Sequence, residues 1–232
     1  MIDKVCGRAA VMKLFRDRHT VLVGGFGVPG TPFALIDALL ESGKSGLTLV
    51  KNEANEDHLG VSKLIEAGRV ARLIVSHLGL NATAIGCMNR GEIQVEFFPQ
   101  GILAEKIRAG GAGLFGFVTD IGVDTILKEG KEVIRTREGR ELILEPALRA
   151  DIALIHAVRG DRFGNLVYEK SARNFNPAMA TAADVVIAEV EEIVETGEIP
   201  PDAIHTPGAF VDHVVEIGEL TPDYGVLSRH VV

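Results

Sequence analysis

Residues 21–32 read VLVGGFGVPGTP, and this stretch decides the predicted fold. The apolar triplet at residues 21–23 predicts the end of a buried strand, and the glycines after it predict a tight turn. Thr31 and Pro32 are residue types that cap and begin helices, so we expect a helix to start there. Such a strand, turn and helix N-terminus form a natural anion site. The loop residues expected to contact a ligand are Gly24, Gly25, Phe26, Gly27, Val28, Pro29 and Gly30.

The same stretch also matches the dinucleotide-binding pattern G-x-G-x-x-G, from Gly25 to Gly30. Glu53 ends the next predicted strand, near the position of the acidic residue that binds ribose in that motif. Two features oppose this interpretation. Pro29 precedes the last glycine, so the helix restarts later than the motif requires, and residues 50–55 are unusually polar. An NAD-dependent oxidoreductase remains an alternative function at this point.

Apolar segments alternate with helical patterns through the first half of the chain. We predict strands at residues 21–23, 47–50, 73–75 and 93–97, and helices at residues 32–41, 57–66 and 103–108. Apolar residues at helical spacing from Val5 to Phe15 predict one more short helix. Strands that alternate with helices indicate parallel strands joined by crossover helices.

The pattern changes in the second half. Residues 131–145 alternate in polarity around Glu138 and Gly139, which is typical of a hairpin. Further predicted elements are strands at residues 152–158 and 166–168 around a glycine turn, a small helix from Asn176 and a buried strand at residues 185–189. We therefore predict one α/β domain over residues 1–232, built as a mostly parallel open sheet with crossover helices and an inserted β-hairpin region.

Composition narrows the classes of function. The 32 acidic residues against 24 basic ones give a net charge of −8, which argues against a nucleic-acid-binding protein. Cys6 and Cys87 match neither a disulfide framework nor metal-ligand spacing, so we expect a reduced, cytoplasmic compartment and no metal. No apolar run is long enough to span a membrane, and the first residues lack the apolar core of a signal peptide.

Residues 21–32 resemble the amino-terminal signature of the family I coenzyme A transferases, in their alpha subunit. That signature is an apolar triplet, GGF, three residues, a glycine, any residue and a proline; the two-residue turn that often begins it differs here at Arg18. Further strings resemble the same subunit in order and spacing: SHLG at residues 76–79, FFPQG at 97–101, RAGGAG at 108–113, SARNFNP at 171–177 and TPGAFVDH at 206–213. The resemblance therefore covers nearly the whole chain.

This resemblance implies transfer of coenzyme A between an acyl-CoA and a small carboxylate such as acetate, succinate or a 3-oxoacid. Members of the family use a glutamate, in a Ser-Glu-Asn-Gly string, to accept the acyl group and then coenzyme A. That string is absent here, and two-subunit members carry it on the beta subunit. The resemblance thus implies the alpha subunit of an A2B2 hetero-oligomer, with two alpha and two beta chains. It also implies a nucleophile on the beta subunit, with no cofactor besides coenzyme A as substrate.

Gln100 is the candidate catalytic residue. It lies between a predicted strand and the next helix, where α/β sheets bind ligands, and its amide can donate to developing charge. A helix-start glutamine that faces water is the structural alternative, whereas the resemblance implies a glutamine that orients the carboxyl group. Asn52 and Glu53 end the second strand, so we expect them beside the glycine loop and the substrate. The resemblance implies two asparagines there, and Glu53 would disfavour an anionic acyl tail.

The remaining motifs are assigned structural roles. Gly110 is interpreted as a helix C-cap, and His77 as a structural histidine because no Ser-His-Asp spacing accompanies it. Residues 171–177 and 206–213 are interpreted as a helix entry and a turn. Two alternative functions stay open: a non-enzymatic ligand-binding or regulatory module of the same fold, and a sugar-phosphate isomerase of related architecture.

Overall fold

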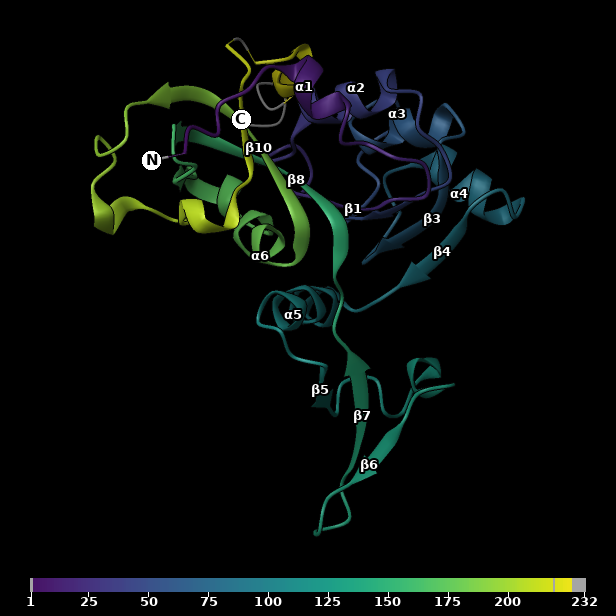
Figure 1. The fold of residues 1–232 in the computed structure, drawn as a ribbon. Coiled ribbons are helices and arrows are strands. Elements are labelled where there is room, and N and C mark those ends of the chain that lie inside the picture. The colour runs from purple at the N-terminus through teal and green to yellow at the C-terminus, as the bar shows by residue number, and fades with distance from the viewer. Residues whose placement is uncertain (1, 219, 227–232) are drawn as a thin grey trace.

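The computed structural model describes residues 2–218 and 220–226, and an eight-stranded sheet forms its centre (Figure 1). The strands of this sheet are β1 (Thr20–Val23), β2 (Leu47–Val50), β3 (Val70–Val75), β4 (Gln94–Phe97), β8 (Ala150–Asp161), β9 (Leu166–Val167), β10 (Ala183–Val194) and β11 (His213–Glu216). They run in the order β11-β10-β8-β1-β2-β3-β4 with every neighbouring pair parallel, while β9 pairs antiparallel with β8. The predicted mostly parallel open sheet is confirmed.

Helices cover both faces of this sheet. One face carries α1 (Arg8–Met12), α2 (Phe33–Glu41), α3 (Val61–Glu66) and α4 (Ala82–Asn89), and the other carries α5 (Gln100–Gly111) and α6 (Asn176–Thr181) (Figure 1). Val21 and Val23 belong to the first core, whereas Leu22 between them belongs to the second. Residues 21–23 of β1 are buried on both faces of the sheet, which explains their continuous apolar run.

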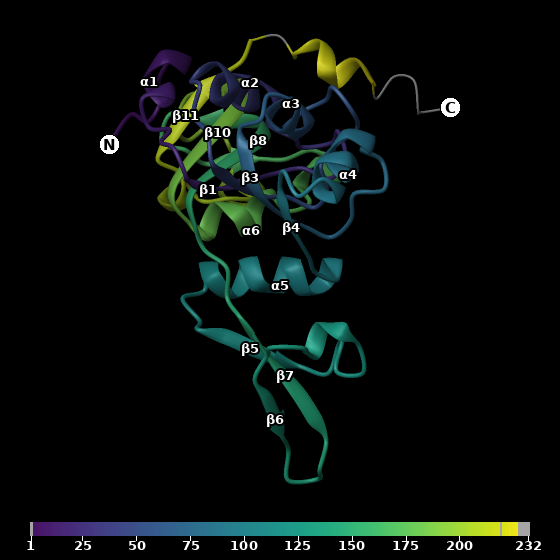
Figure 2. The same cartoon turned by 90° about the vertical axis from the view of Figure 1, so that its right-hand side faces the viewer.

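The inserted hairpin region forms a second sheet of its own. Its strands are β5 (Gly116–Thr119), β6 (Val133–Arg135) and β7 (Glu141–Pro146), in the antiparallel order β5-β7-β6. Figures 1 and 2 show this sheet projecting from the main body on the far side of α5. A buried ion pair joins the two parts, because Lys106 of α5 lies 3.0 Å from Glu145 of β7. The predicted hairpin around Gly139 is confirmed.

The start of α2 differs from the prediction. The first helical residue is Phe33, Pro32 is the N-cap, and the side chain of Thr31 does not cap the helix. Its hydroxyl instead donates to the carbonyl oxygen of Gly27 at 2.7 Å. The buried carboxylate of Glu189, on β10, accepts from the backbone N–H of Leu35 at 2.8 Å. A protein carboxylate therefore already occupies part of the helix N-terminus that we expected to bind a ligand anion.

Other helix boundaries also differ, for tertiary reasons. The N-terminal helix begins only at Arg8, because Val5 forms a parallel bridge with Val214 of β11. Helix α5 extends to Gly111, so the prediction that Gly110 is a C-cap was wrong. A Cβ on Gly110 would lie 2.0 Å from the carbonyl oxygen of Leu148, so this glycine allows close packing instead. Helix α4 and the strands β5 and β11 were not predicted.

Short 3-10 helices complete the described chain: η1 (Ile126–Lys128), η2 (Lys170–Arg173), η3 (Pro201–Ala203), η4 (Gly208–Phe210) and η5 (Pro222–Val226). Within the described residues, no helix is long and apolar enough to cross a membrane. Strand β1 pairs with β2 on one side and with β8 on the other, so the order of strands reverses there. In open α/β sheets the crevice beyond the carboxyl ends of the strands at such a point is the usual ligand site.

Candidate active site

The glycine loop, residues 24–30, lies at this switch point. Gly24 donates its N–H to the carbonyl oxygen of Leu154 on β8, at 2.9 Å. Gly25 has φ +99°, and a Cβ there would lie 2.1 Å from the hydroxyl oxygen of Thr31 and 2.7 Å from its backbone nitrogen. Gly27 has φ +61°, but the nearest atom to a Cβ there is 3.9 Å away. Gly25 is therefore required by the fold of the loop itself, whereas a Cβ on Gly27 would make only an ordinary contact.

The segment at residues 171–177 holds this loop in place. Asn174 donates its side-chain N–H to the carbonyl oxygen of Pro29 at 2.9 Å, and Asn176 donates to that of Gly30 at 3.0 Å. The sequence pattern indicated only a helix entry here, and these contacts were not predicted. The two asparagines in SARNFNP were the available signal, since their short amides bind backbone groups readily.

The end of β2 contacts the glycine loop, as expected. Glu53 is only 3% exposed. One of its carboxylate oxygens accepts from Lys51 Nζ at 2.6 Å and from the backbone N–H of Gly27 at 3.1 Å, and the other accepts from Asn52 Nδ2 at 2.7 Å. Glu53 is thus neutralised and enclosed, so it cannot bind a ribose or repel an acyl tail as a free carboxylate. This geometry opposes the dinucleotide interpretation.

Lys51 is a component of the site that was not predicted from the sequence. Its side chain is completely buried, and its ammonium group forms an ion pair with Glu53. Burial lowers the pKa of Lys51 below its usual range, and the neighbouring carboxylate of Glu53 opposes that change. A lysine directly after a buried apolar strand was the signal in the sequence, since lysines are almost never fully buried without a partner.

Gln100 is the first residue of α5, at the carboxyl end of β4, and its side chain is exposed. Its Nε2 donates to Asn52 Oδ1 at 2.9 Å, and the same oxygen lies 2.9 Å from the hydroxyl of Ser76. An amide nitrogen carries two hydrogens, so this bond leaves one for a substrate. Hydrogen bonds therefore connect the loop at Gly27 with Gln100, through Glu53 and Asn52.

A cavity of about 330 Å³ lies beside Gln100. It is lined by Phe26, Gln100, Gly101, Ala104, Asn174, Phe175 and Ala178. Phe26 belongs to the glycine loop and is 45% exposed, so its ring is accessible from solvent. The cavity thus combines the glycine loop, the start of α5 and the entry to α6. An amide donor at an apolar cavity can orient a carboxyl or thioester group whose tail is apolar.

His156 lies on the other side of the loop, beside a second cavity of about 460 Å³ that Pro29 and Gly30 also line. The ring of His156 lies 3.0 Å from Glu189 and 3.2 Å from Glu191. Burial alone would lower the pKa of His156, but hydrogen bonds to these two carboxylates outweigh burial and raise it to about 9. The buried imidazolium is therefore a paired cation rather than a free base.

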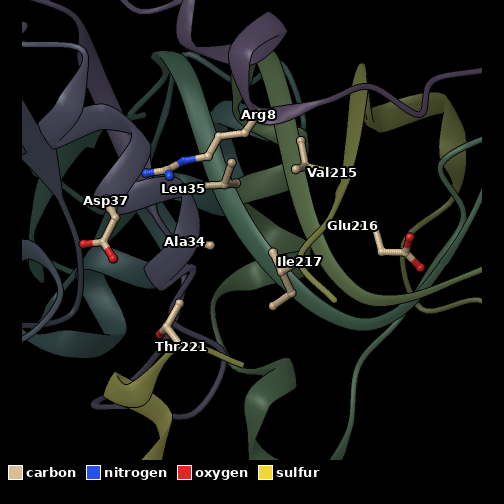
Figure 3. Close-up of a pocket in the computed structure, with 8 residues that line it drawn as sticks. All are labelled: Arg8, Ala34, Leu35, Asp37, Val215, Glu216, Ile217 and Thr221. Atoms are coloured by element: carbon tan, nitrogen blue, oxygen red, sulfur yellow. The ribbon is translucent and has the colours of Figure 1, made fainter. Parts of the chain in front are cut away.

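A third cavity, of about 250 Å³, lies between α1, α2 and the end of β11 (Figure 3). Its charged side chains already have partners, since Arg8 pairs with Glu41 and Asp37 pairs with Lys63. Figure 3 shows the carboxylate of Glu216 pointing away from this space. None of the residues predicted to bind substrate lines this cavity. The ring of His77, which the sequence indicated as structural, lies 3.0 Å from the hydroxyl of Ser76.

Comparison with known proteins identifies relatives of this chain. Sequence relatives include the alpha subunit of the acetate CoA-transferase of Escherichia coli (strain K12), which is 52% identical over 199 residues, 86% of this chain and 90% of the relative. The corresponding subunit of the succinyl-CoA:3-ketoacid coenzyme A transferase of Xanthomonas campestris pv. campestris (strain B100) is 49% identical, over 88% of this chain and 84% of its own.

Solved structures show the same fold. An acyl-CoA transferase from Escherichia coli O157:H7, in a thioester complex with CoA, superposes with a TM-score of 0.85 at 22% identity over 95% of this chain. This chain spans only 48% of that protein, about half of its length. The glutaconate coenzyme A-transferase of Acidaminococcus fermentans gives a TM-score of 0.81 at 20% identity, over 95% of this chain and 77% of its own. The sequence profile of coenzyme A transferases matches residues 8–217. This chain belongs to the coenzyme A transferase family.

Proposed function

We propose that the chain is the alpha subunit of a two-subunit enzyme that moves coenzyme A between an acyl-CoA and a small carboxylate. The observation that carries this proposal is the hydrogen bond from Gln100 to Asn52 at the apolar cavity beside the glycine loop. In this role Gln100 donates its second amide hydrogen to the acyl oxygen, where charge develops in the transition state. The glycine loop, with Asn52 and Glu53 behind it, positions the acyl-CoA. The two sequence relatives named above are subunits of the same type, which supports this role.

The nucleophile in this proposal is a glutamate of the beta subunit. Among the residues that the structure describes, no carboxylate lines the cavity, and the nearby Glu53 already binds Lys51 and Gly27. The partner's carboxylate attacks the acyl-CoA carbonyl carbon, the C–S bond breaks, and an acyl-glutamyl anhydride and coenzyme A thiolate form. The thiolate then attacks the glutamyl carbonyl carbon, which releases the first acid as its carboxylate and leaves a glutamyl-CoA thioester. A second carboxylate reverses both steps.

Two properties of the assembly follow from this proposal. We expect equal numbers of the two chains, because each active site needs one of each kind, and the family resemblance implies that they form an A2B2 hetero-oligomer. We also expect it to act in the reducing cytoplasm, which agrees with Cys6 and Cys87 being free thiols.

The proposal is tested by locating the covalent intermediate. The purified complex with the beta subunit is incubated with an acyl-CoA in the absence of an acceptor, and the intact mass of both chains is measured. We expect a coenzyme A adduct on the partner and no modification of this chain. We also expect this chain, when isolated, to transfer no coenzyme A. An adduct on this chain, or turnover by this chain alone, would contradict the proposal.

A further inference from the structure

The last described segment of the chain, residues 220–226, packs against the start of α2 and is here called the strap. The ring of Tyr224 lies edge-on to Phe33, the first residue of α2, with the ring centroids 4.8 Å apart. Asp223 anchors the strap to α3, because its carboxylate lies 2.6 Å from Lys63 Nζ. The family profile matches residues 8–217, so the strap lies beyond the part of the chain that the profile describes.

The hydroxyl of Tyr224 reaches the residue that follows the glycine loop. It donates to the carbonyl oxygen of Thr31 and lies 2.9 Å from Nδ1 of His156. Thr31 is completely buried and holds the loop at two places. Its own hydroxyl donates to the carbonyl oxygen of Gly27 at 2.7 Å, and its backbone N–H donates to that of Val28 at 3.1 Å. Hydrogen bonds therefore connect the strap, through Thr31, with the glycine loop.

The strap and the glycine loop also line the same cavity. Leu220 and Tyr224 contribute to the lining of the space of about 460 Å³ to which Pro29 and Gly30 of the loop contribute as well. A loop with several glycines has many backbone conformations open to it. Contacts that favour one of these conformations determine how often the loop is ready to bind a ligand.

We propose that the strap holds the glycine loop in the conformation that binds acyl-CoA, with Tyr224 as the positioning residue. The inference rests on the proposed function, in which this loop positions the acyl-CoA. Tyr224 touches no substrate in this role, because it acts on the loop through Thr31. Loss of its hydroxyl should lower the fraction of chains with a competent loop, which weakens the apparent affinity for acyl-CoA by the same factor. The kcat should change little, because saturating acyl-CoA selects the competent conformation.

Tyr224→Phe tests the hydroxyl and keeps the ring against Phe33. The variant should fold, because the carbonyl oxygen of Thr31 also accepts from the backbone N–H of Phe33 at 3.0 Å. In the complex with the beta subunit, the KM for acyl-CoA should rise about fivefold, the effect of losing one ordinary hydrogen bond, while kcat stays nearly unchanged. Tyr168→Phe is the matched control, since it removes the hydroxyl of the chain's other tyrosine, which bonds to Thr206 at 2.7 Å. This control should keep the wild-type KM.

Two further measurements separate positioning of the loop from a general loss of stability. Hydrogen exchange of the complex, followed by mass spectrometry, should be faster at residues 24–31 in Tyr224→Phe than in wild type or Tyr168→Phe. Asp223→Asn, which weakens the attachment of the strap to Lys63, should raise the KM for acyl-CoA about twofold, because the pair is partly exposed. Asp37→Asn removes the other carboxylate that pairs with Lys63 and should keep the wild-type KM.

The results that would overturn the inference differ from those that would overturn the proposed function. An unchanged KM for acyl-CoA in Tyr224→Phe overturns the inference, whether or not exchange at the loop becomes faster. Faster exchange spread evenly over the whole chain also overturns it, because the strap would then stabilise the fold rather than hold the loop. A wild-type complex that transfers no coenzyme A overturns the proposed function instead, and exchange at residues 24–31 still decides whether the strap holds the loop.

Discussion

At the scale of single residues, the site depends on a chain of hydrogen bonds that begins in the protein interior. Lys51 compensates Glu53, Glu53 orients both Gly27 and Asn52, and Asn52 orients Gln100. Two residues chosen from the sequence as substrate contacts, Asn52 and Glu53, are therefore buried supports for Gln100 and the loop. Their proposed role in binding is to fix the groups that touch substrate.

Replacement of Gln100 tests the outer end of this chain. Gln100→Ala should lower kcat about a hundredfold, or about 2.7 kcal/mol, as loss of one donor to developing charge does. The KM for acyl-CoA should change little, because the contact strengthens in the transition state. Stability should change little as well, since Gln100 is exposed. Steady-state kinetics of the complex provide the measurement, and Gln94→Ala, at an exposed glutamine of β4, is the control. Near-normal turnover would remove Gln100 from the site.

The inner end of the chain is tested by stability. Glu53→Gln leaves the buried ammonium of Lys51 without its counter-charge, so the free energy of unfolding should fall by about 3–5 kcal/mol. The double variant Lys51→Met with Glu53→Gln removes both charges and should recover most of that loss. Urea unfolding measures both variants. Glu92→Gln, which breaks an exposed pair with Arg90, should change little. If Glu53→Gln were as stable as wild type, the ion pair of Lys51 with Glu53 would not contribute to the stability of the fold.

At the scale of elements, two glycines of the glycine loop have different roles, which the sequence alone does not distinguish. A methyl group on Gly25 would collide with backbone atoms of Thr31, whereas one on Gly27 would meet nothing nearer than 3.9 Å. In Gly27→Ala, the alanine must adopt the left-handed backbone conformation of Gly27, which costs about 1–2 kcal/mol of stability. The conformation of the loop thus requires Gly25, and we propose that the ligand approaches the loop at Gly27.

Alanine substitutions in the loop should show this difference. Gly25→Ala should destabilise the chain by clearly more than Gly27→Ala, because it adds a steric clash to the backbone strain. Gly27→Ala should instead raise the KM for acyl-CoA in the complex. Gly43→Ala is a matched control, since Gly43 also has a positive φ of +70° and open space around it but lies outside the site. The same KM in Gly27→Ala and Gly43→Ala would show that Gly27 does not approach the ligand.

The elements also show how far the sequence could predict this structure. The parallel strands and the hairpin follow from apolar runs and turn residues, which are local signals. The start of α2 does not follow from local signals. Its N-terminus is stabilised by Glu189, which lies 154 positions from Leu35 in the chain. The clamp from Asn174 to Pro29 spans 145 positions. Gln100 was identified by its strand-end position, but its link to Asn52 required the fold.

At the scale of the whole molecule, the end of the described chain packs beside the residues that follow the glycine loop. Tyr224, in η5, donates its hydroxyl hydrogen to the carbonyl oxygen of Thr31 and lies 2.9 Å from the ring nitrogen of His156. Its ring also packs edge-on against Phe33, with the centroids 4.8 Å apart. The C-terminal segment, β8, β10 and the start of α2 therefore meet around one buried imidazolium, His156. Its protonation state should affect the stability of the whole chain.

The pH dependence of unfolding tests this arrangement. The pKa of His156 is raised from 6.5 to about 9 in the folded chain, so the native state binds this proton more tightly than the unfolded state. The resulting stabilisation, about 3 kcal/mol, is fully present below pH 6.5 and is lost as the pH rises through 9. Wild-type stability in urea should fall across that window, while His156→Gln should be less stable at pH 6 and lack most of the fall. His58→Gln removes a histidine whose pKa is raised by its hydrogen bond to Glu66, but that histidine is exposed, so this variant should lose much less of the fall than His156→Gln. Parallel profiles for wild type and His156→Gln would show that the buried imidazole does not hold its proton at neutral pH.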